Sequence, residues 1–181
     1  MTLDGATRLE EVGPAHEVAY LDMVADFERA GEGYGWNDVE TARVDFATFV
    51  RDLAREARGE GLPPGICAQT TYILLHADGR ALGEIRFRPE PGDDLEALMA
   101  ANGHLGYNVR PSARNHGHAT RMLALALERA RAAGLARVML PVRDDNLASA
   151  RVVERNGGQL ERRAVDQESG DLMRVYWIAL A

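Results

Sequence analysis

The hydrophobic residues of this chain follow two spacings, one typical of helices and one typical of strands. From residue 119 to residue 133 they recur at helical spacing, and Gly134 follows as a helix stop. Residues 70–77, TTYILLHA, are rich in β-branched and aromatic side chains, as strands are. The first pattern predicts an amphipathic helix and the second predicts a strand.

The same two patterns predict an order of elements along the whole chain. Helices are expected over about 14–30, 39–58, 93–102, 119–133 and 146–156. Strands are expected over 7–12, 70–77, 81–90, 104–111, 137–142, 159–166 and 172–180. Hairpins stand at both ends of this order, with a strand–helix–strand–helix run between them. We therefore expect an α+β fold whose mostly antiparallel sheet has one parallel crossover in its middle.

Length and composition suit one domain with its own core. The chain has 181 residues, of which 46% are hydrophobic, so a single domain spanning 1–181 is expected. Its one cysteine, Cys67, excludes an internal disulfide and favours a reduced, cytoplasmic setting. Neither a signal peptide nor an apolar run long enough to span a membrane is visible in the sequence, so no membrane association is expected.

The charge balance disfavours one class of partner. Twenty-one basic and 28 acidic side chains give a formal net charge of -7. Non-specific nucleic-acid binding needs clustered positive charge, so no nucleic-acid partner is expected. The balance would suit a cationic small substrate, although many proteins are equally acidic.

The stretch RNHGHAT, residues 114–120, lies between a predicted strand and a predicted helix. The first turn of a helix offers unpaired backbone N–H groups that attract an anion such as phosphate, and Gly117 would permit close approach. Residues 110–121 hold three arginines, two histidines and no acid. A plain turn capped by Ser112 or Asn115 remains the alternative. A metal site would need more ligands than these histidines provide, so no metal is expected.

Two blocks carry a resemblance to a known family. Residues 114–119 resemble the Q/R-x-x-G-x-G/A signature of the GNAT superfamily of acyl-CoA-dependent N-acyltransferases, most closely a bacterial subgroup of uncharacterised members. The second block, LPVRDDNLASARVVERNGG at 140–158, resembles the family's next strand and helix. There Asn146 is followed by Ser149 and by the E-x-x-G of residues 154–157. An acyl-CoA-binding core at about 104–158 is implied.

The resemblance implies acetyl-CoA as the cosubstrate and a set of residues that bind it. The strand before RNHGHAT would be bulged and would splay from the next parallel strand, leaving a gap for the pantetheine arm. The implied coenzyme A-binding residues are Asn108, Val109, Arg114, Asn115, His116, Gly117, His118, Ala119, Thr120, Asn146 and Ser149. Pro141 supports the splay independently, because a fully paired central strand should avoid proline. An edge strand or a bulge would explain that proline equally well.

Two positions depart from the family's pattern. Many members carry a tyrosine seven residues after the asparagine, where its hydroxyl can protonate the leaving thiolate; here that position is Val153. The aromatic residue that usually follows the E-x-x-G glycine is replaced by Gly158. The general acid is therefore absent or supplied elsewhere, and solvent could protonate a thiolate whose reference pKa is about 8.5.

The expected reaction is direct attack of an amine on the thioester, with a base to remove its proton. Glu84 is the first candidate, on a strand expected beside 104–111; a solvated glutamate paired with arginine is the alternative. His104 is the second candidate, and Tyr107 the third, as a proton relay. Alternatively, His104 would only hydrogen-bond to the backbone, and Tyr107 would only pack as an aromatic side chain.

The loop GEGYGWNDVE, 31–40, is expected to build part of the acceptor site. Glu32 and Asp38 could hold an ammonium group, and Tyr34 and Trp36 could give it an aromatic wall. A flexible acidic loop with its aromatics in the core is the alternative. This loop favours a small amine over an acidic substrate.

The leading hypothesis is an N-acetyltransferase that acts on a primary amine of a small molecule or peptide. A catalytically silent acyl-CoA-binding or regulatory module is the second, and a metal-binding protein using His104, His116 and His118 the third. Proteins of this family are often dimers, so a homodimer is possible. The sequence names neither the amine nor the length of the acyl chain.

Overall fold

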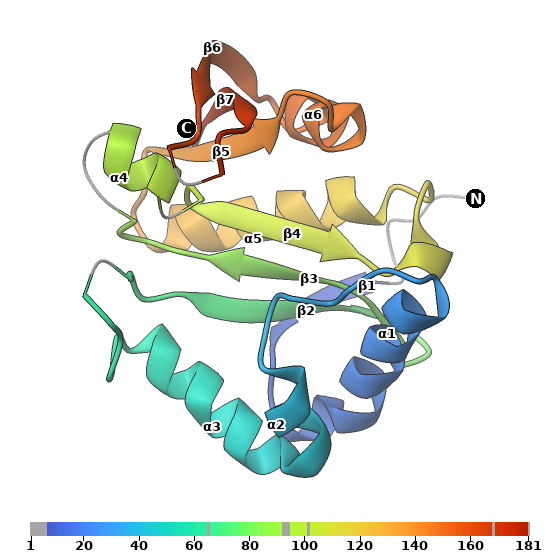
Figure 1. Ribbon diagram of the computed structural model, residues 1–181. Helices are drawn as coiled ribbons and strands as arrows, with labels where there is room; N and C mark the ends of the chain where they lie inside the picture. The colour runs from blue at the N-terminus through green and yellow to red at the C-terminus, as the bar shows by residue number, and fades with distance from the viewer. Residues whose placement is uncertain (1–6, 65, 92–94, 101, 168, 181) are drawn as a thin grey trace.

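The computed structural model describes residues 7–64, 66–91, 95–100, 102–167 and 169–180, without the side chains of residues 95 and 100. The first half of the chain builds a four-stranded antiparallel sheet in the order β1-β2-β3-β4 (Figure 1). Its strands are β1 (Thr7–Glu11), β2 (Thr70–His76), β3 (Ala81–Phe87) and β4 (Leu105–Val109). Each predicted strand in this half is present within a few residues of its expected ends.

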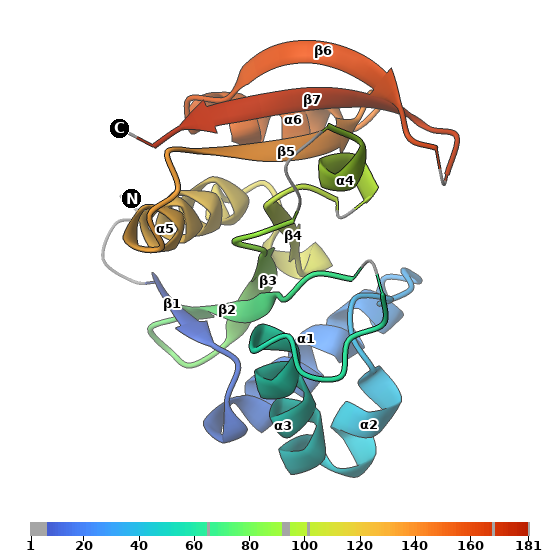
Figure 2. The same cartoon turned by 90° about the vertical axis from the view of Figure 1, so that its left-hand side faces the viewer.

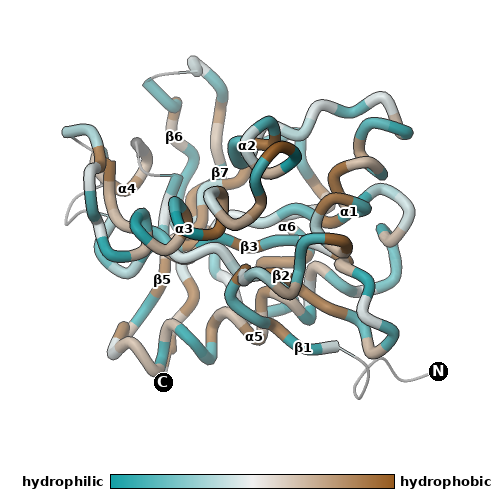
Figure 3. Tube along the Cα trace, turned by 90° about the horizontal axis from the view of Figure 1, so that it is seen from below, coloured by the Kyte–Doolittle hydropathy of each residue, from teal (hydrophilic) through white to brown (hydrophobic). Residues whose placement is uncertain are grey.

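Helices cover both faces of this sheet (Figures 1 and 2). A short 3-10 turn, Pro14–His16, leads into α1 (Glu17–Arg29), which lies on one face with α2 (Val39–Val44) and α3 (Phe46–Ala57). On the other face lies α5 (His118–Ala132), whose short runs of hydrophobic and hydrophilic residues are visible in Figure 3. The amphipathic helix predicted over 119–133 is confirmed.

The second half builds a three-stranded antiparallel sheet in the order β5-β7-β6. Its strands are β5 (Arg137–Arg143), β6 (Gln159–Val165) and β7 (Leu172–Ala179). The helix α6 (Leu147–Arg155) packs on one face, beside α5, and α4 (Leu95–Ala100) packs on the other through Leu98 and Met99. The helix predicted over 93–102 is thus present at its centre; residues 93, 94 and 101 lie outside the described part.

The two sheets meet along β4 and β5, which run in the same direction (Figure 1). The backbone N–H of His104 donates to the carbonyl of Met139 at 2.9 Å, and the N–H of Met139 donates to His104 Nδ1 at 3.0 Å. Beyond this point no ladder between β4 and β5 is found in the described residues, so the strands diverge. Pro141 lies on this unpaired side of β5 while pairing in register with Val175 of β7. The predicted parallel crossover with a splayed pair is confirmed, although it divides two sheets rather than lying within one.

Gly103 lies at the start of the seam between β4 and β5, where the two segments of the chain pass close to each other. A Cβ at this position would lie 2.5 Å from the carbonyl oxygen of Met139 and 2.6 Å from Cδ of Pro141, and its φ is +69°. We expect Gly103→Ala to lower the free energy of unfolding by about 1–3 kcal/mol more than Gly79→Ala. Gly79 is the matched control, because its φ is +89° but nothing lies within 4 Å of an added Cβ. Urea unfolding measures the free energy of unfolding of both variants. Equal losses would show that the backbone conformation of the glycine, and not its contact at the seam, determines the loss.

Two details differ from the sequence predictions. The single helix expected over 39–58 is wrong: it is interrupted at Asp45, where the chain leaves helical geometry and the carboxylate accepts the N–H of Thr48 at 3.0 Å. The bulge expected in β4 is also not seen, since its pairing with β3 is regular from Leu105 to Val109. The strand diverges from β5 without one.

Candidate active site

The start of α5 is built to leave backbone donors free. Gly117 adopts the left-handed conformation, with φ +82°, and no side chain caps the helix. The first bond of the helical ladder runs from the N–H of Arg121 to the carbonyl of Gly117. The N–H groups of residues 118–120 come before it, and as at any helix start they have no acceptor within the helix. This end carries the positive pole of the helix dipole, which favours an anion.

A cavity of about 690 Å³ opens over this helix start. It is bounded by the end of β4, the loop before α5 and the first turns of α6. All the predicted coenzyme A-binding residues except His116 line it. Its charged lining residues are Arg114, Arg151 and Arg155, with no acid in the described lining. The charge and the free donors therefore suit a polyanionic ligand.

Asn108 offers a second group to which a ligand in this cavity could hydrogen-bond. Its side-chain Oδ1 and Nδ2 are both buried and have no hydrogen-bond partner in the part of the chain that the structure describes. Buried amides are nearly always hydrogen-bonded, and Asn108 lines the 690 Å³ cavity at the splayed strand. Coenzyme A combines phosphates with an amide-containing arm, so this set of residues fits it.

Several predicted residues of the loop also make contacts within the protein. Arg114 donates from both terminal nitrogens to Glu32 at 2.6 Å and from Nε to the carbonyl of Val109 at 3.1 Å. Asn146 caps α6 by accepting the N–H of Ser149 at 3.0 Å. His116 bonds the carbonyl of Arg114 through Nδ1 and does not line the cavity. Glu32, expected at the acceptor site, thus lies beside the loop that precedes α5.

A second cavity, of about 410 Å³, lies on the other side of the seam. Trp36 from the α1–α2 loop, Arg86 and Arg88 from the end of β3, and the strands β4, β5 and β7 line it. Three residues, Tyr107, Asn146 and Ser149, line both this cavity and the 690 Å³ one. The two cavities therefore meet where β4 and β5 diverge.

Tyr107 stands at this junction. Its hydroxyl donates to the backbone carbonyl of Ser149 at 3.3 Å, and burial raises its pKa to about 12. The phenol is therefore protonated, and able to donate, at neutral pH. Val153, at the family's tyrosine position, is fully buried in the core and offers no proton.

Glu84 is fully buried on β3, against the α1–α2 loop. The hydroxyl of Tyr34 donates to it at 2.6 Å, and Nδ2 of Asn37 lies 2.9 Å from both of its oxygens. Burial raises the pKa of the Glu84 carboxyl above the usual range of a glutamate, although Tyr34 and the Arg86 charge, 3.7 Å away, act in the opposite direction. The solvated alternative for Glu84 is therefore wrong.

Glu84 lines neither cavity, but its neighbour Arg86 lines one of them. Arg86 lines the 410 Å³ cavity and donates to Asn37 Oδ1 at 2.6 Å. Asn37 and Arg86 line a third cavity, of about 530 Å³, together with Trp36. The carboxylate is thus one side chain away from the space where an acceptor could bind.

The remaining candidates for proton transfer and acceptor binding are His104, Asp38, Tyr34 and Trp36. His104 is buried, its Nδ1 accepts the amide of Met139, and it lines none of the three cavities described above. Asp38 caps α2 by accepting the N–H of Thr41 at 3.0 Å and lines the 530 Å³ cavity. Tyr34 faces Glu84, whereas Trp36 reaches the 410 Å³ cavity. The structure therefore brings Trp36 and Tyr107, but neither Glu32 nor Asp38, to that cavity.

Metal-ligating side chains do not gather in the described residues: no group of three or more His, Cys, Asp or Glu could hold an ion there. His116 and His118 stack with their ring centroids 6.1 Å apart.

Comparison with known proteins identifies the family. Residues 7–159 match the family model described as the acetyltransferase (GNAT) domain. The chain belongs to the GNAT acetyltransferase family. The sequence predictions of its family, its fold class and its nature as an acyl-CoA-dependent N-acetyltransferase are thereby confirmed. A search of curated proteins found no match.

Solved GNAT structures share the fold at low identity. RimL, a ribosomal L7/L12 alpha-N-protein acetyltransferase in complex with coenzyme A, is 19% identical with a TM-score of 0.69, covering 98% of this chain and 96% of that one. MccE, the microcin C7 self-immunity acetyltransferase in complex with acetyl-CoA and AMP, is 12% identical with a TM-score of 0.69, covering 97% and 93%. The putative acetyltransferase yncA from Salmonella typhimurium, with acetyl-CoA, is 15% identical with a TM-score of 0.63, covering 98% and 95%.

Sequence reasoning missed part of this GNAT site. Asn37, Arg88, Arg151 and Arg155 were not singled out. The two α6 arginines could have been found, because they are four residues apart and follow Asn146 on one predicted helix. Asn37 had no local signal, since its partners Glu84 and Arg86 are far away in the sequence.

Among the described residues, no helix is both long and apolar enough to cross a membrane.

Proposed function

We propose that this GNAT protein acetylates a primary amine by direct transfer from acetyl-CoA, with both substrates bound at the β4–β5 seam. The observation that carries the proposal is the meeting of the two cavities at Tyr107, Asn146 and Ser149. Reactants held on the two sides of one seam gain the rate advantage of proximity. No covalent enzyme intermediate is needed in such an arrangement.

The 690 Å³ cavity is proposed to hold the cosubstrate. The N–H groups of residues 118–120 would bind its pyrophosphate, and Arg151 and Arg155 would offset further phosphate charge. Asn108 would pair its buried amide with the pantetheine arm. Bound there, acetyl-CoA supplies the activated acyl group.

Proton transfer is assigned to two residues. Glu84 is proposed to accept a proton from the acceptor amine through an intervening water, which its raised pKa and its separation from the 410 Å³ cavity both support. Tyr107 is proposed to take the role of the tyrosine replaced by Val153, because its hydroxyl is protonated and lies where the cavities meet. His104 is proposed to hold the two strands together at the seam rather than to transfer a proton.

The acceptor is proposed to be a small molecule or the amino end of a peptide. RimL is described as acting on a ribosomal protein, and MccE as bound to acetyl-CoA and AMP, so related folds bind partners of both sizes. The 410 Å³ cavity has the volume of a small-ligand site.

Two measurements test the proposal. Calorimetry with acetyl-CoA and dephospho-CoA should show binding that weakens when the 3′-phosphate is missing. A thiol-release assay over a panel of amines should then show turnover. Binding without turnover of any amine would favour the silent acyl-CoA-binding module, and no binding by the folded protein would overturn the assignment of the 690 Å³ cavity.

We further propose a cytoplasmic protein, on the support of its single free cysteine. A homodimer is proposed on the edge strand β6, where Leu160 and Val165 are 44% and 54% exposed. Light scattering of the purified protein decides the oligomeric state.

A further inference from the structure

The 410 Å³ cavity carries a charge that neither the whole chain nor the α1–α2 loop would suggest. Its charged lining residues are Arg86, Arg88 and Arg143, and no acid lines it in the described part of the chain. The net charge of the whole molecule is -7. A concentrated positive site on an acidic protein suggests selection for a negative ligand group.

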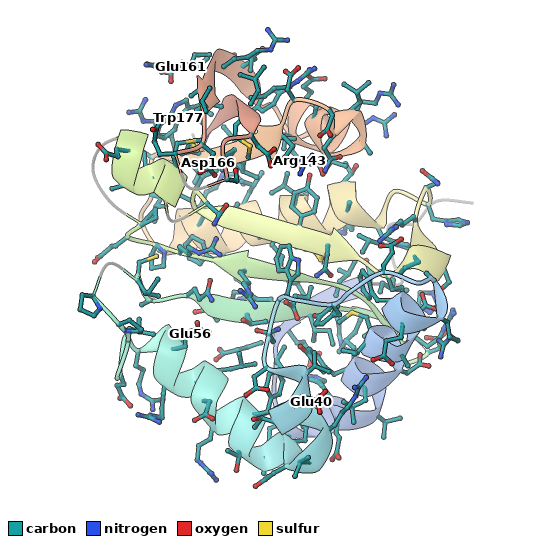
Figure 4. The ribbon with its side chains drawn as sticks, viewed as in Figure 1. Glu40, Glu56, Arg143, Glu161, Asp166 and Trp177 are labelled. Atoms are coloured by element: carbon teal, nitrogen blue, oxygen red, sulfur yellow. The ribbon has the colours of Figure 1, made fainter. Side chains whose placement is uncertain are left out.

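Two of the three arginines have acidic partners. Arg143, at the carboxyl end of β5 (Figure 4), donates to Asp145 at 3.0 Å and to Asp171 at 3.1 Å. Arg86 lies 3.7 Å from Glu84 and stacks over Trp36 at 5.3 Å from its ring centroid. Their charges are therefore largely offset within the protein.

Arg88 is different. Among the described residues its guanidinium makes one hydrogen bond, a long one from Nη1 to the carbonyl of Gly103 at 3.5 Å, and no described carboxylate lies within ion-pair distance of it. Glu56, on the last turn of α3 (Figure 4), influences the pKa of Arg88 from a distance but accepts its hydrogen bond from Gln69. The guanidinium is half-buried, and burial lowers its pKa, so its charge is poorly solvated as well as unpaired.

Gly106 of β4 brings Arg88 and Trp36 together. A Cβ at Gly106 would lie 3.4 Å from the Trp36 ring and 3.8 Å from Nη1 of Arg88. The next residue is Tyr107, at the junction with the 690 Å³ cavity. An aromatic surface, a free guanidinium and the point of acyl transfer thus share one small cavity.

We propose that Arg88 and Trp36 select an acceptor whose amine carries a nearby oxyanion, a carboxylate or a phosphate. The inference rests on the proposed function and names its substrate class. Arg88 would bind the oxyanion, for which a guanidinium offers paired donors, while Trp36 packs against the carbon skeleton. This reverses the expectation from the acidic loop, because Glu32 and Asp38 point to other partners.

The first test uses matched acceptor pairs that differ in one anionic group: an amino acid and its amide, and O-phosphoserine amide and serine amide. We expect the parent protein to prefer at least one anionic member by about tenfold to a hundredfold in kcat/KM. Arg88→Gln should remove the preference, and Arg88→Lys should keep part of it. The matched control is Arg143→Gln, which removes a paired arginine from the same cavity and should keep the preference.

The second test measures binding of an anion in the absence of turnover. In a Trp177→Phe background Trp36 is the sole tryptophan, and saturating coenzyme A occupies the other anion site. Inorganic phosphate or acetate should then change Trp36 fluorescence in a saturable way, and Arg88→Gln should abolish the change while coenzyme A affinity and melting temperature are kept.

The outcomes separate this inference from the proposed function. Turnover of neutral and anionic amines at equal efficiency, or an unchanged preference in Arg88→Gln, overturns the inference and leaves the acetyltransferase assignment intact. An Arg88-dependent fluorescence change without turnover of any amine supports the oxyanion site and overturns the proposed reaction. The carboxylate and phosphate pairs decide which oxyanion is preferred.

Discussion

Replacing Gly117 by glutamate should weaken acetyl-CoA binding at least about a hundredfold. The substitution adds a side chain with negative charge at the start of α5, where the free N–H groups of residues 118–120 would meet a pyrophosphate. It also strains a position whose φ is +82°. Calorimetry with the folded variant measures the loss.

Gly134 gives a matched control at the other end of the same helix. Its φ is +86°, and nothing lies within 4 Å of an added Cβ, so Gly134→Glu brings the same strain and the same charge. It does not line the 690 Å³ cavity, and its coenzyme A affinity should be unchanged. Equal affinity in the two folded variants would refute the phosphate-binding role of the loop.

Replacing Glu84 by glutamine should lower kcat about a hundredfold or more while acetyl-CoA affinity is kept, if the carboxylate is the general base. Because burial raises its pKa, the parent should lose activity on the acid side at a pH above the usual carboxylate range. The base acts when deprotonated, so kcat rises with pH through that pKa. In Glu84→Gln this acid limb should disappear.

Glu154→Gln is the control for Glu84. Glu154 also accepts a tyrosine hydroxyl, from Tyr176 at 2.8 Å, but lines none of the three cavities described above. Its kcat and pH profile should match the parent. A Glu84→Gln enzyme that keeps the acid limb and shows only a higher acceptor KM would assign Glu84 to positioning Asn37 and the α1–α2 loop.

The sequence predicted the elements well because their signals are local. The hairpin of β2 and β3 follows from two β-rich runs around Asp78 and Gly79, and α5 from the helical spacing of its hydrophobic residues before Gly134. The break at Asp45 was missed although it too is local. Asp38 and Asp45 each precede a threonine by three residues, and each carboxylate caps a helix through that threonine. Hydrophobic spacing continued across the second cap and concealed it.

The predicted coenzyme A loop agrees with the cavity more closely than the predicted acceptor residues do. The loop is one continuous segment, so a single motif places its backbone groups. The acceptor cavity is assembled from β3, β4, β5, β7 and the α1–α2 loop, and its charge depends on which side chains pair elsewhere. Glu32 accepts hydrogen bonds from Arg114, 82 residues away, and Asn37 donates to Glu84, 47 residues away. Such pairings have no local signature.

The seam between β4 and β5 has a consequence for acyl-group selection. One core cluster joins the two sheets through α5, whereas hydrogen bonds join them at His104 and Met139 near one end. Apolar contacts are not directional, so a slight rotation of one sheet about that end would disturb few strong interactions. The width of the gap at Tyr107 is then governed by side-chain size and by the hydrogen bond from the Tyr107 hydroxyl to the carbonyl of Ser149. Longer or shorter acyl chains could be accommodated by substitutions there without altering either hydrogen-bonded sheet.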